Sequence, residues 1–209
     1  ETMNGKGVLI VISGFSGAGK GTLVNRLINE YDNYALSISM TTRAPREGET
    51  DGKSYFFVTR EAFQNKIKEN GFLEYASYCD NYYGTPKAYV EEQLQSGKDV
   101  ILEIEVQGAL QIKEKYPDAL LLFVTPPSAG ILHDRLASRQ TETAEVIAKR
   151  MRTAAKESEL MHKYDYIVVN DDLDTCVKDT HEMIRAAHAS SVRVTEFIDI
   201  LKADLSKFS

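Results

Sequence analysis

The glycine-rich stretch at residues 14–22 reads Gly14-Phe15-Ser16-Gly17-Ala18-Gly19-Lys20-Gly21-Thr22. An apolar run at 8–12 precedes it and predicts a buried strand, and a helical apolar pattern follows at 23–28. Strand, glycine loop and helix in this order are typical of a phosphate-binding loop, because loop N–H groups and the positive helix end meet the phosphate oxygens. The sequence therefore predicts an α/β fold that binds a nucleoside triphosphate. A glycine turn without a ligand is the competing interpretation, which the flanking patterns disfavour.

The end of this loop departs at one position from the strict pattern G-x-x-x-x-G-K-[ST]. Lys20 stands where its cation reaches the β- and γ-phosphates, but Gly21 replaces the usual hydroxyl residue and Thr22 comes one position later. We therefore expect the nucleotide phosphates and water to hold a Mg²⁺ ion, and the sequence leaves Thr22 open as a side-chain ligand.

The composition indicates a globular protein with small partners. The chain has 209 residues, 43% of them hydrophobic, which is enough for one unit with a buried core. A net charge of −6 argues against a nucleic-acid surface, which needs an excess of Lys and Arg. No apolar run is long enough to span a bilayer, no signal-peptide pattern is visible, and Cys79 and Cys176 fit a reducing compartment. We therefore expect a cytoplasmic protein that binds neither nucleic acid nor membrane.

Strand and helix patterns alternate along most of the chain. The predicted strands lie at 7–13, 55–58, 72–78, 81–85, 100–106, 119–124 and 166–170. The predicted helices lie at 20–31, 59–70 with Gly71 as C-cap, 87–96, 109–116, 128–139, 144–164 and 173–189. A closing helix is expected to turn Val194, Phe197, Ile198 and Leu201 inward. This order predicts a three-layer fold with a central parallel sheet covered on both faces.

The segment 39–86 is richer in short strands, tyrosines and loops than the rest of the chain. We interpret it as a lobe inserted into a core formed by residues 3–38 and 87–209. It carries two arginines and two tyrosines that suit a second, separate phosphate: Arg43, Arg46, Tyr55 and Tyr83. A single arginine is more often a solvated surface charge, but the concentration of these groups in one lobe favours a site for a phosphate monoester.

Nearly the whole chain resembles the guanylate kinase family, in the nucleoside monophosphate kinase group. The motifs that carry the resemblance are Thr41-Thr42-Arg43-Ala44-Pro45-Arg46, Gly52-Lys53-Ser54-Tyr55-Phe56-Phe57, Phe72-Leu73-Glu74-Tyr75, Asn81-Tyr82-Tyr83-Gly84-Thr85, Glu103-Ile104-Glu105-Val106-Gln107-Gly108 and Asn170-Asp171-Asp172. The resemblance implies a P-loop core, a GMP-binding lobe at 39–86 and a small lid at about 135–150. It also implies transfer of the γ-phosphate of ATP to GMP or dGMP, with Mg²⁺ accompanying the ATP.

The resemblance assigns roles to single residues as well. The phosphate of GMP is expected at Arg43, Arg46, Tyr55 and Tyr83, and its base at Ser39, Glu74, Thr85 and Glu105. The catalytic cations are expected to be Lys20, Arg43, Arg139 and Arg150, and ATP is expected to contact the loop at 14–22 together with Asn170 and Asp171. The base contacts are chemically consistent, because guanine donates from N1 and N2 to a carboxylate and accepts at O6 from a hydroxyl.

Several of these residues have a competing interpretation. Glu74 alone would more often be a charged residue on an edge strand facing water, and Asp171 a helix N-terminal acid. Arg135, one helical turn before Arg139, either joins the cations at the ATP phosphates or is a surface charge, and a surface charge is the expectation. Gln140 replaces the usual glycine of the lid and Phe15 the usual proline of the loop, so lid flexibility and the role of the Phe15 side chain stay open.

Two other functions compete with the kinase. One is a protein-interaction domain that keeps the guanylate kinase fold without catalysis. The other is a kinase for a different nucleoside monophosphate, because Lys20-Gly21-Thr22 also resembles adenylate kinase. The intact loop, together with Arg43, Arg46 and Glu74, favours guanylate kinase. The sequence leaves open whether the chain forms a homo-oligomer.

Overall fold

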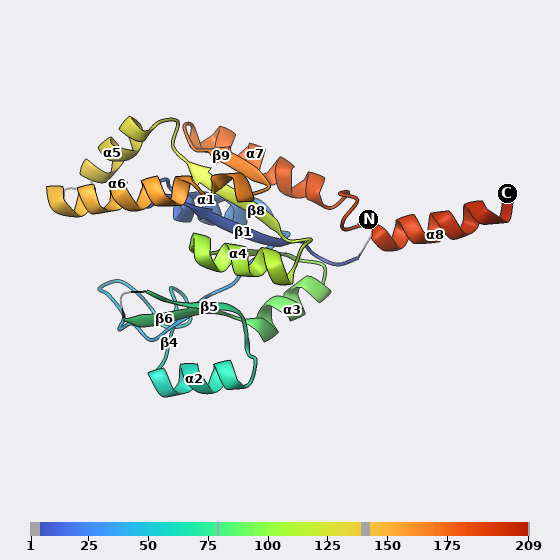
Figure 1. The fold of residues 1–209 in the computed structure, drawn as a ribbon, viewed down its shortest axis with the longest axis horizontal. Coiled ribbons are helices and arrows are strands. Elements are labelled where there is room, and N and C mark those ends of the chain that lie inside the picture. The colour runs from blue at the N-terminus through green and yellow to red at the C-terminus, as the bar shows by residue number, and fades with distance from the viewer. Residues whose placement is uncertain (1–4, 79, 139–142, 209) are drawn as a thin grey trace.

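The computed structural model describes residues 5–78, 80–138 and 143–208, which form a large body, a smaller lobe and a projecting helix (Figure 1). The body is built on a parallel sheet of five strands in the order β2-β7-β1-β8-β9. These strands are β1 (Leu9–Gly14), β2 (Tyr34–Leu36), β7 (Asp99–Glu103), β8 (Leu120–Thr125) and β9 (Tyr166–Val169). The predicted α/β fold with a central parallel sheet is therefore confirmed.

Helices cover both faces of this sheet. α1 and α7 pack against each other on one face, and α3 and α4 lie on the other (Figure 1). Their bounds are α1 (Lys20–Glu30), α3 (Lys87–Gln95), α4 (Val106–Lys115) and α7 (Leu173–Ala187). Strand β1 is buried along its whole length between β7 and β8. Because β1 is the central strand and ends at Gly14, the loop that follows lies at the carboxyl edge of the sheet, where α/β proteins bind ligands.

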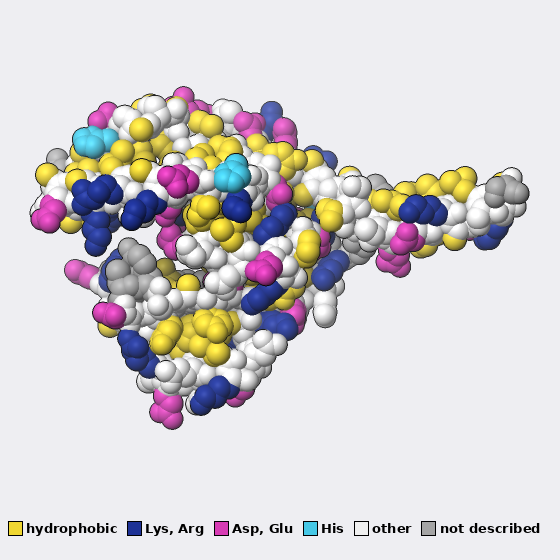
Figure 2. Space-filling model, in the orientation of Figure 1, with side chains coloured by type: hydrophobic (Ala, Val, Ile, Leu, Met, Phe, Trp, Pro, Cys, Tyr) yellow, Lys and Arg dark blue, Asp and Glu magenta, His cyan; other side chains and the backbone are white. Residues whose placement is uncertain are grey.

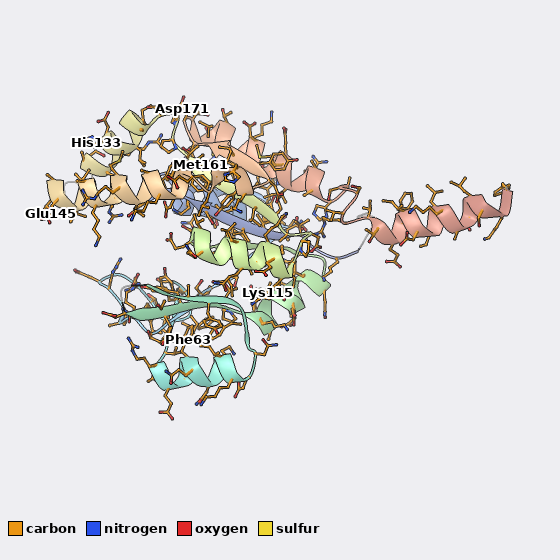
Figure 3. All side chains as sticks on the ribbon, viewed as in Figure 1. Phe63, Lys115, His133, Glu145, Met161 and Asp171 are labelled. Atoms are coloured by element: carbon orange, nitrogen blue, oxygen red, sulfur yellow. The ribbon has the colours of Figure 1, made fainter. Side chains whose placement is uncertain are left out.

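The smaller lobe has its own mixed sheet with the order β4-β3-β6-β5. Its elements are β3 (Met40–Thr41), β4 (Phe56–Phe57), α2 (Arg60–Lys68), β5 (Phe72–Tyr78) and β6 (Asn81–Pro86). Helix α2 packs on the sheet through Phe63, whose ring centre lies 4.4 Å from that of Phe72 and 5.3 Å from that of Tyr82 (Figure 3). The lobe meets the body at α4, where Lys115 Nζ donates to the carbonyl of Leu73 at 2.9 Å.

The remaining helices lie at two ends of the molecule. They are α5 (Ala129–Ala137), α6 (Ala144–Ser158), the short 3-10 helices η1 (Met161–Lys163) and η2 (Ser206–Phe208), and α8 (Thr195–Leu205). α5 and α6 pack together at one end, and α8 projects from the other (Figure 1). Within the described part of the chain, none of the helices is both long and apolar enough to cross a membrane.

Three predicted boundaries are wrong for local reasons. The strand expected at 100–106 ends at Glu103, because Glu105 caps α4 and its carbonyl accepts the N–H of Ala109 at 3.0 Å. The helix expected at 144–164 ends at Ser158, because the chain must return to the sheet edge. The left-handed residue after α2 is Asn70, with φ 53°, rather than Gly71, since asparagine tolerates that conformation.

The prediction for the closing helix is also wrong. Val194 is buried at its base, but Phe197 and Leu201 are about half exposed, and no residue of α8 itself is buried. The apolar stripe is present, yet none of the body that the structure describes lies beneath it. An amphipathic pattern predicts that one face needs cover but does not say what provides it.

Candidate nucleotide-binding site

Two glycines of the loop at 14–22, Gly14 and Gly19, sit where no other residue fits. Gly14 has φ 150°, and a Cβ there would lie 2.1 Å from the carbonyl oxygen of Val124. Gly19 is the N-cap of α1 with φ 90°, and a Cβ there would lie 2.5 Å from Nδ2 of Asn170. The loop is therefore pressed against the ends of β8 and β9, which fixes its curvature in front of the positive end of α1.

The lysine of the loop folds back onto it. Lys20 Nζ donates to the carbonyl of Gly14 at 2.6 Å and to that of Phe15 at 3.2 Å. This places the cation over the concave side of the loop, where phosphate oxygens can replace the two carbonyls as partners. The side chain of Phe15 points the other way and packs edge-on against Phe123 with ring centres 4.9 Å apart, so it belongs to the core.

Asn170 braces the loop from the end of β9. Its Nδ2 donates to the carbonyl of Ala18 at 2.9 Å, and Arg135 Nη2 donates to the carbonyl of Asn170 at 2.9 Å. Arg135 is thus part of the support of the loop, and the expectation of a plain surface charge is wrong. Asp171 is exposed beside it (Figure 3). The helix-cap role that competed for Asp171 falls to Asp172, whose side chain accepts the N–H of Thr175 at 2.9 Å.

Helix α6 brings a second cation to the loop. Arg150 Nη1 donates to the hydroxyl of Ser16, so residues 134 positions apart meet at the phosphate loop. Arg139 and Gln140 lie outside the described residues, and so do two other residues of the expected lid.

An open cavity of about 300 Å³ lies between the body and the smaller lobe. Four of the predicted site residues line it, Lys20 and Glu105 from the body and Ser39 and Tyr55 from the lobe. Figure 2 shows the molecule hollowed between the body and the lobe on the side away from α8. Residues of the phosphate loop and of the lobe, which are far apart in the sequence, thus line one cavity.

The lobe gathers three of the four predicted phosphate ligands. The guanidinium of Arg43 lies 5.3 Å from the ring centre of Tyr55, whose ring centre is 6.1 Å from that of Tyr83. Arg43 donates two parallel hydrogen bonds to Glu49, at 2.8 and 2.9 Å, which lower the pKa of that carboxyl. Arg46 reaches Glu49 through its backbone N–H at 2.7 Å, and its side chain is exposed.

Glu74 and Thr85 form a buried pair. Thr85 Oγ1 donates to Glu74 Oε1 at 2.6 Å, and both residues are buried, so the competing interpretation of a carboxylate facing water is wrong. Burial raises the pKa of Glu74, and the hydrogen bond from Thr85 acts against this. Gly108 of α4 permits the approach, because a Cβ there would lie 2.6 Å from Glu74 Oε2. In this conformation the Thr85 hydroxyl therefore donates its one hydrogen bond to Glu74.

Two acids near the loop were not assigned a role from the sequence. A Cβ at Gly21 would lie 3.9 Å from both carboxylate oxygens of Glu103, which ends β7 beside β1. Burial raises the pKa of Glu103, and Lys20 lowers it. Burial, together with the charge of Glu105, raises the pKa of Glu157 on α6 to about 7. The sequence indicated a functional role for Glu103 only weakly, because it is an acid at the end of a predicted strand. Nothing in the helical pattern of α6 distinguishes Glu157 from an ordinary surface acid.

Comparison with known proteins gives a consistent result. The family model described as guanylate kinase matches residues 6–187. The chain is 48% identical over 201 residues to a guanylate kinase of Latilactobacillus sakei subsp. sakei, covering 96% of this chain and 98% of that protein. It is 50% identical over 194 residues to one of Lactococcus lactis subsp. lactis, covering 93% and 95%. The crystal structure of guanylate kinase from Anaplasma phagocytophilum is similar with a TM-score of 0.77 and 30% identity, covering 96% of this chain and 97% of that one.

Proposed function

The chain belongs to the guanylate kinase family, and we propose that its cavity is where the γ-phosphate of ATP passes to GMP or dGMP, giving ADP and GDP or dGDP. The activity is that of a guanylate kinase, as in the curated relatives that match nearly the full length. The observation that carries the proposal is the shared cavity, which is lined by Lys20 of the phosphate loop and by Ser39 and Tyr55 of the lobe. A transfer between two nucleotides needs both sets of groups around one space.

We propose that Arg43, Arg46, Tyr55 and Tyr83 bind the phosphate of GMP. The placement of the Arg43 fork supports this, because Glu49 already occupies it with two parallel hydrogen bonds, as a phosphate would. Binding of GMP then exchanges one anion for another at Arg43.

We further propose that Ser39, Glu74, Thr85 and Glu105 read the guanine base. Glu74 is a carboxylate with acceptor capacity for the N1 and N2 hydrogens, and Thr85 must turn its hydroxyl from Glu74 to reach O6. Both side chains are buried in this conformation, so base binding requires the lobe at 39–86 to shift relative to the core at 3–38 and 87–209. The lid at about 135–150 closes over ATP in the same step, which excludes water that would otherwise hydrolyse it.

The chemistry needs no covalent intermediate. An anionic oxygen of the GMP phosphate attacks the γ-phosphorus in line, the new O–P bond forms, and the bond to the bridging oxygen of ADP breaks. Lys20, Arg150 and, by resemblance, Arg139 and Arg43 stabilise the charge on the moving phosphoryl group. The hydrogen bond between Arg150 and Ser16 supports this role, because it holds that cation at the loop. The loop residues 14–22 orient the phosphates of ATP. Asn170 and Asp171 contact the adenine base of ATP.

Two oxygen-bearing side chains near the loop, Glu103 and Thr22, support a site for the Mg²⁺ ion that accompanies ATP. Glu103 brings a carboxylate to the side of Gly21, the position at which phosphate loops usually carry a hydroxyl, and the exposed Thr22 follows. Hard oxygen ligands of this kind fit Mg²⁺. We propose that Glu103, together with Thr22, would hold the hydrated ion, which would neutralise charge on the donor phosphates. A location in the cytoplasm stays a prediction from the sequence.

A coupled assay that follows ADP formation tests the proposed function, with GMP, dGMP, AMP and UMP as acceptors at equal concentration. We expect turnover with GMP and dGMP, and a kcat/KM for AMP and UMP lower by on the order of 10⁴-fold. Faster turnover with AMP or UMP would assign the site to another monophosphate. Absence of turnover in folded protein that still binds GMP would favour the interaction domain.

A further inference from the structure

The side chain of Ser37 carries a hydroxyl that no step of the reaction described above uses. Ser37 directly follows β2, and its exposed fraction is 7%. Within the part of the chain that the structure describes, its Oγ is buried and has no hydrogen-bond partner. Most buried polar side chains have such a partner, and a buried hydroxyl without one destabilises the fold. This hydroxyl therefore indicates a partner that comes from outside the protein.

Ser37 lines the cavity between the body and the lobe. Its N–H donates to the carbonyl of Ile101 at 3.0 Å, so the backbone continues the pairing of β2 with β7 at the carboxyl edge of the sheet. The place of the residue is therefore set by the core before any nucleotide binds. The partner of its hydroxyl is accordingly a group that enters this cavity.

The other hydroxyl side chains around this cavity already have a partner or a proposed role. Four hydroxyl residues of the described chain line it, namely Ser37, Ser39, Ser54 and Tyr55. Ser39 and Tyr55 are proposed to bind the base and the phosphate of GMP. Ser54 is exposed, and its Oγ accepts the N–H of Thr50 at 3.1 Å. Of the four, Ser37 is the one whose hydroxyl is both buried and without an assigned contact.

The part of GMP without an assigned contact is its ribose. The sugar joins the base to the phosphate, so it lies between Ser39 and Tyr55 when both ends of the nucleotide are bound. A ribose hydroxyl can donate and accept a hydrogen bond, and so can the hydroxyl of serine. The two groups can therefore pair in either direction, and neither brings a charge into the buried site.

The spacing along the chain favours the 2′-hydroxyl of that ribose. Ser37 and Ser39 are two positions apart, and two residues span at most about 7 Å. A group bound by Ser37 therefore lies close to the base that Ser39 is proposed to contact. The 2′-carbon is bonded to the carbon that carries the base, so the 2′-hydroxyl is nearer to the base than the 3′-hydroxyl is. This is the hydroxyl that dGMP lacks.

The hydroxyl of Ser37 can turn toward the sugar at low cost. Its oxygen is buried in this conformation, but rotation about the single Cα–Cβ bond moves it from one staggered position to another. Because the rotation breaks no hydrogen bond to a described residue, the bond to the ribose is a net gain. Thr85 differs in this respect, since its hydroxyl must leave Glu74 before it can contact a nucleotide.

We propose that Ser37 is a specificity-determining residue whose hydroxyl bonds the 2′-hydroxyl of the acceptor ribose, so that the enzyme favours GMP over dGMP. This rests on the proposed function, because GMP must bind in the cavity with its base at Ser39 and its phosphate at Tyr55. Both nucleotides remain substrates. A single hydrogen bond between neutral groups changes kcat/KM by about tenfold.

Removing the hydroxyl from the enzyme and from the nucleotide in turn tests the contact. The value of kcat/KM is measured for GMP, dGMP and 3′-deoxy-GMP with the wild type and with Ser37→Ala. We expect the wild type to use GMP about tenfold better than dGMP, and Ser37→Ala to use the two within about twofold, because only its kcat/KM for GMP falls. Ser54→Ala, the matched control that removes another hydroxyl from the same cavity, keeps the wild-type ratio. Ser37→Ala should melt at or above the wild-type temperature, since it removes a buried polar group without a protein partner.

Four results would overturn the proposal. These are an equal loss for GMP and dGMP in Ser37→Ala, a wild type that does not distinguish the two, a Ser37→Ala that loses only the preference over 3′-deoxy-GMP, and a melting temperature of Ser37→Ala more than about 3 °C below the wild type. Absence of turnover with every acceptor in folded wild type would instead refute the proposed function. Calorimetric dissociation constants for GMP and dGMP would then decide the role of Ser37 by the same ratio, independently of turnover.

Discussion

The donor loop and the acceptor lobe hold their functional groups in different ways. In the loop, Gly14 and Gly19 are pressed against Val124 and Asn170, and only glycine fits these close approaches. In the lobe, Arg43 is held by Glu49 and Glu74 by Thr85. The donor half is thus shaped by backbone packing before any nucleotide arrives, whereas the proposed acceptor groups must exchange internal partners for GMP.

This difference has an energetic meaning. A preformed loop loses little conformational freedom when phosphates bind, so its binding energy is available for positioning. The exchange at Arg43 replaces a partly exposed ion pair, which is worth little, with a phosphate. The exchange at Glu74 is more demanding, because its partner is buried and an unpaired carboxylate there is costly. Recognition of the base is therefore the step that depends most on movement of the lobe.

Replacement of Lys20 by alanine gives the largest expected effect and tests the donor half. We expect kcat to fall by on the order of 10³-fold or more, because the cation that follows the transferred phosphoryl group is lost. The melting temperature should change by only a few degrees, since the loop is shaped by its glycines. Lys53→Ala is the matched control, because it also removes a lysine that lines the cavity. A similar loss in both variants would mean that general positive charge, rather than the place of Lys20 on the loop, supports turnover.

Replacement of Glu74 by glutamine tests the acceptor half. The amide keeps the shape but brings an NH₂ group against the N1 and N2 donors of guanine, so kcat/KM for GMP should fall by about 10²-fold. The KM for ATP should stay within about threefold, because removing a base contact does not touch the donor loop. Glu61→Gln, an exposed change on α2 of the same lobe, is the control. Equal losses for the two substrates would refute Glu74 as a base reader.

A methyl group at Gly19 distinguishes backbone packing from backbone strain. Gly19→Ala places Cβ 2.5 Å from Asn170 Nδ2, so that side chain must leave the carbonyl of Ala18. Gly48→Ala in the lobe also has positive φ, at 81°, but meets nothing within 4 Å. We expect Gly19→Ala to be less stable than Gly48→Ala by about 1–2 kcal/mol, roughly 2–8 °C in melting temperature, and to raise the KM for ATP. Equal losses of stability in the two variants, measured by calorimetry, would show that close packing at Gly19 adds nothing to the cost of the positive φ.

The phosphate loop could be predicted from the sequence because its signal is local. Each glycine, the lysine and the flanking strand and helix lie within about twenty residues, and the conformation follows from their order. The alternation of strands and helices likewise predicted the parallel sheet. The order of the strands in the sheet could not be predicted from the sequence, because it depends on pairing between strands that are far apart in the chain.

The parts that the sequence did not predict depend on contacts across the fold. Glu103 meets Gly21 only because β7 pairs with β1, in a register that places Ile12 opposite Glu103. Arg135 supports the loop only because α5 packs at the end of β9. The inward face predicted for α8 was wrong for the same reason, since a stripe of apolar residues does not identify its cover. The roles of single residues in binding GMP and ATP stay predictions, in the donor loop as well as in the acceptor lobe.

The smallest expected effect concerns Glu157 on α6, which lies near enough to Lys20 of the donor loop and to Glu105 to be affected by their charges. Burial and Glu105 raise its pKa from 4.5 to about 7, although Lys20 acts in the opposite direction. An acid with a raised pKa in the folded state costs nothing well below its unfolded value of 4.5, and the destabilisation grows as the pH rises from there to about 7. Glu157→Gln removes that loss, so its melting temperature should equal that of the wild type near pH 4 and exceed it at pH 8. Because the side chain is only partly buried, we expect about 1 kcal/mol, or roughly 2–4 °C. Glu159→Gln changes the exposed C-cap of α6 and is the control, which should show no such pH dependence in thermal unfolding from pH 4 to 8. The same curve for both variants would mean that burial does not hold Glu157 protonated.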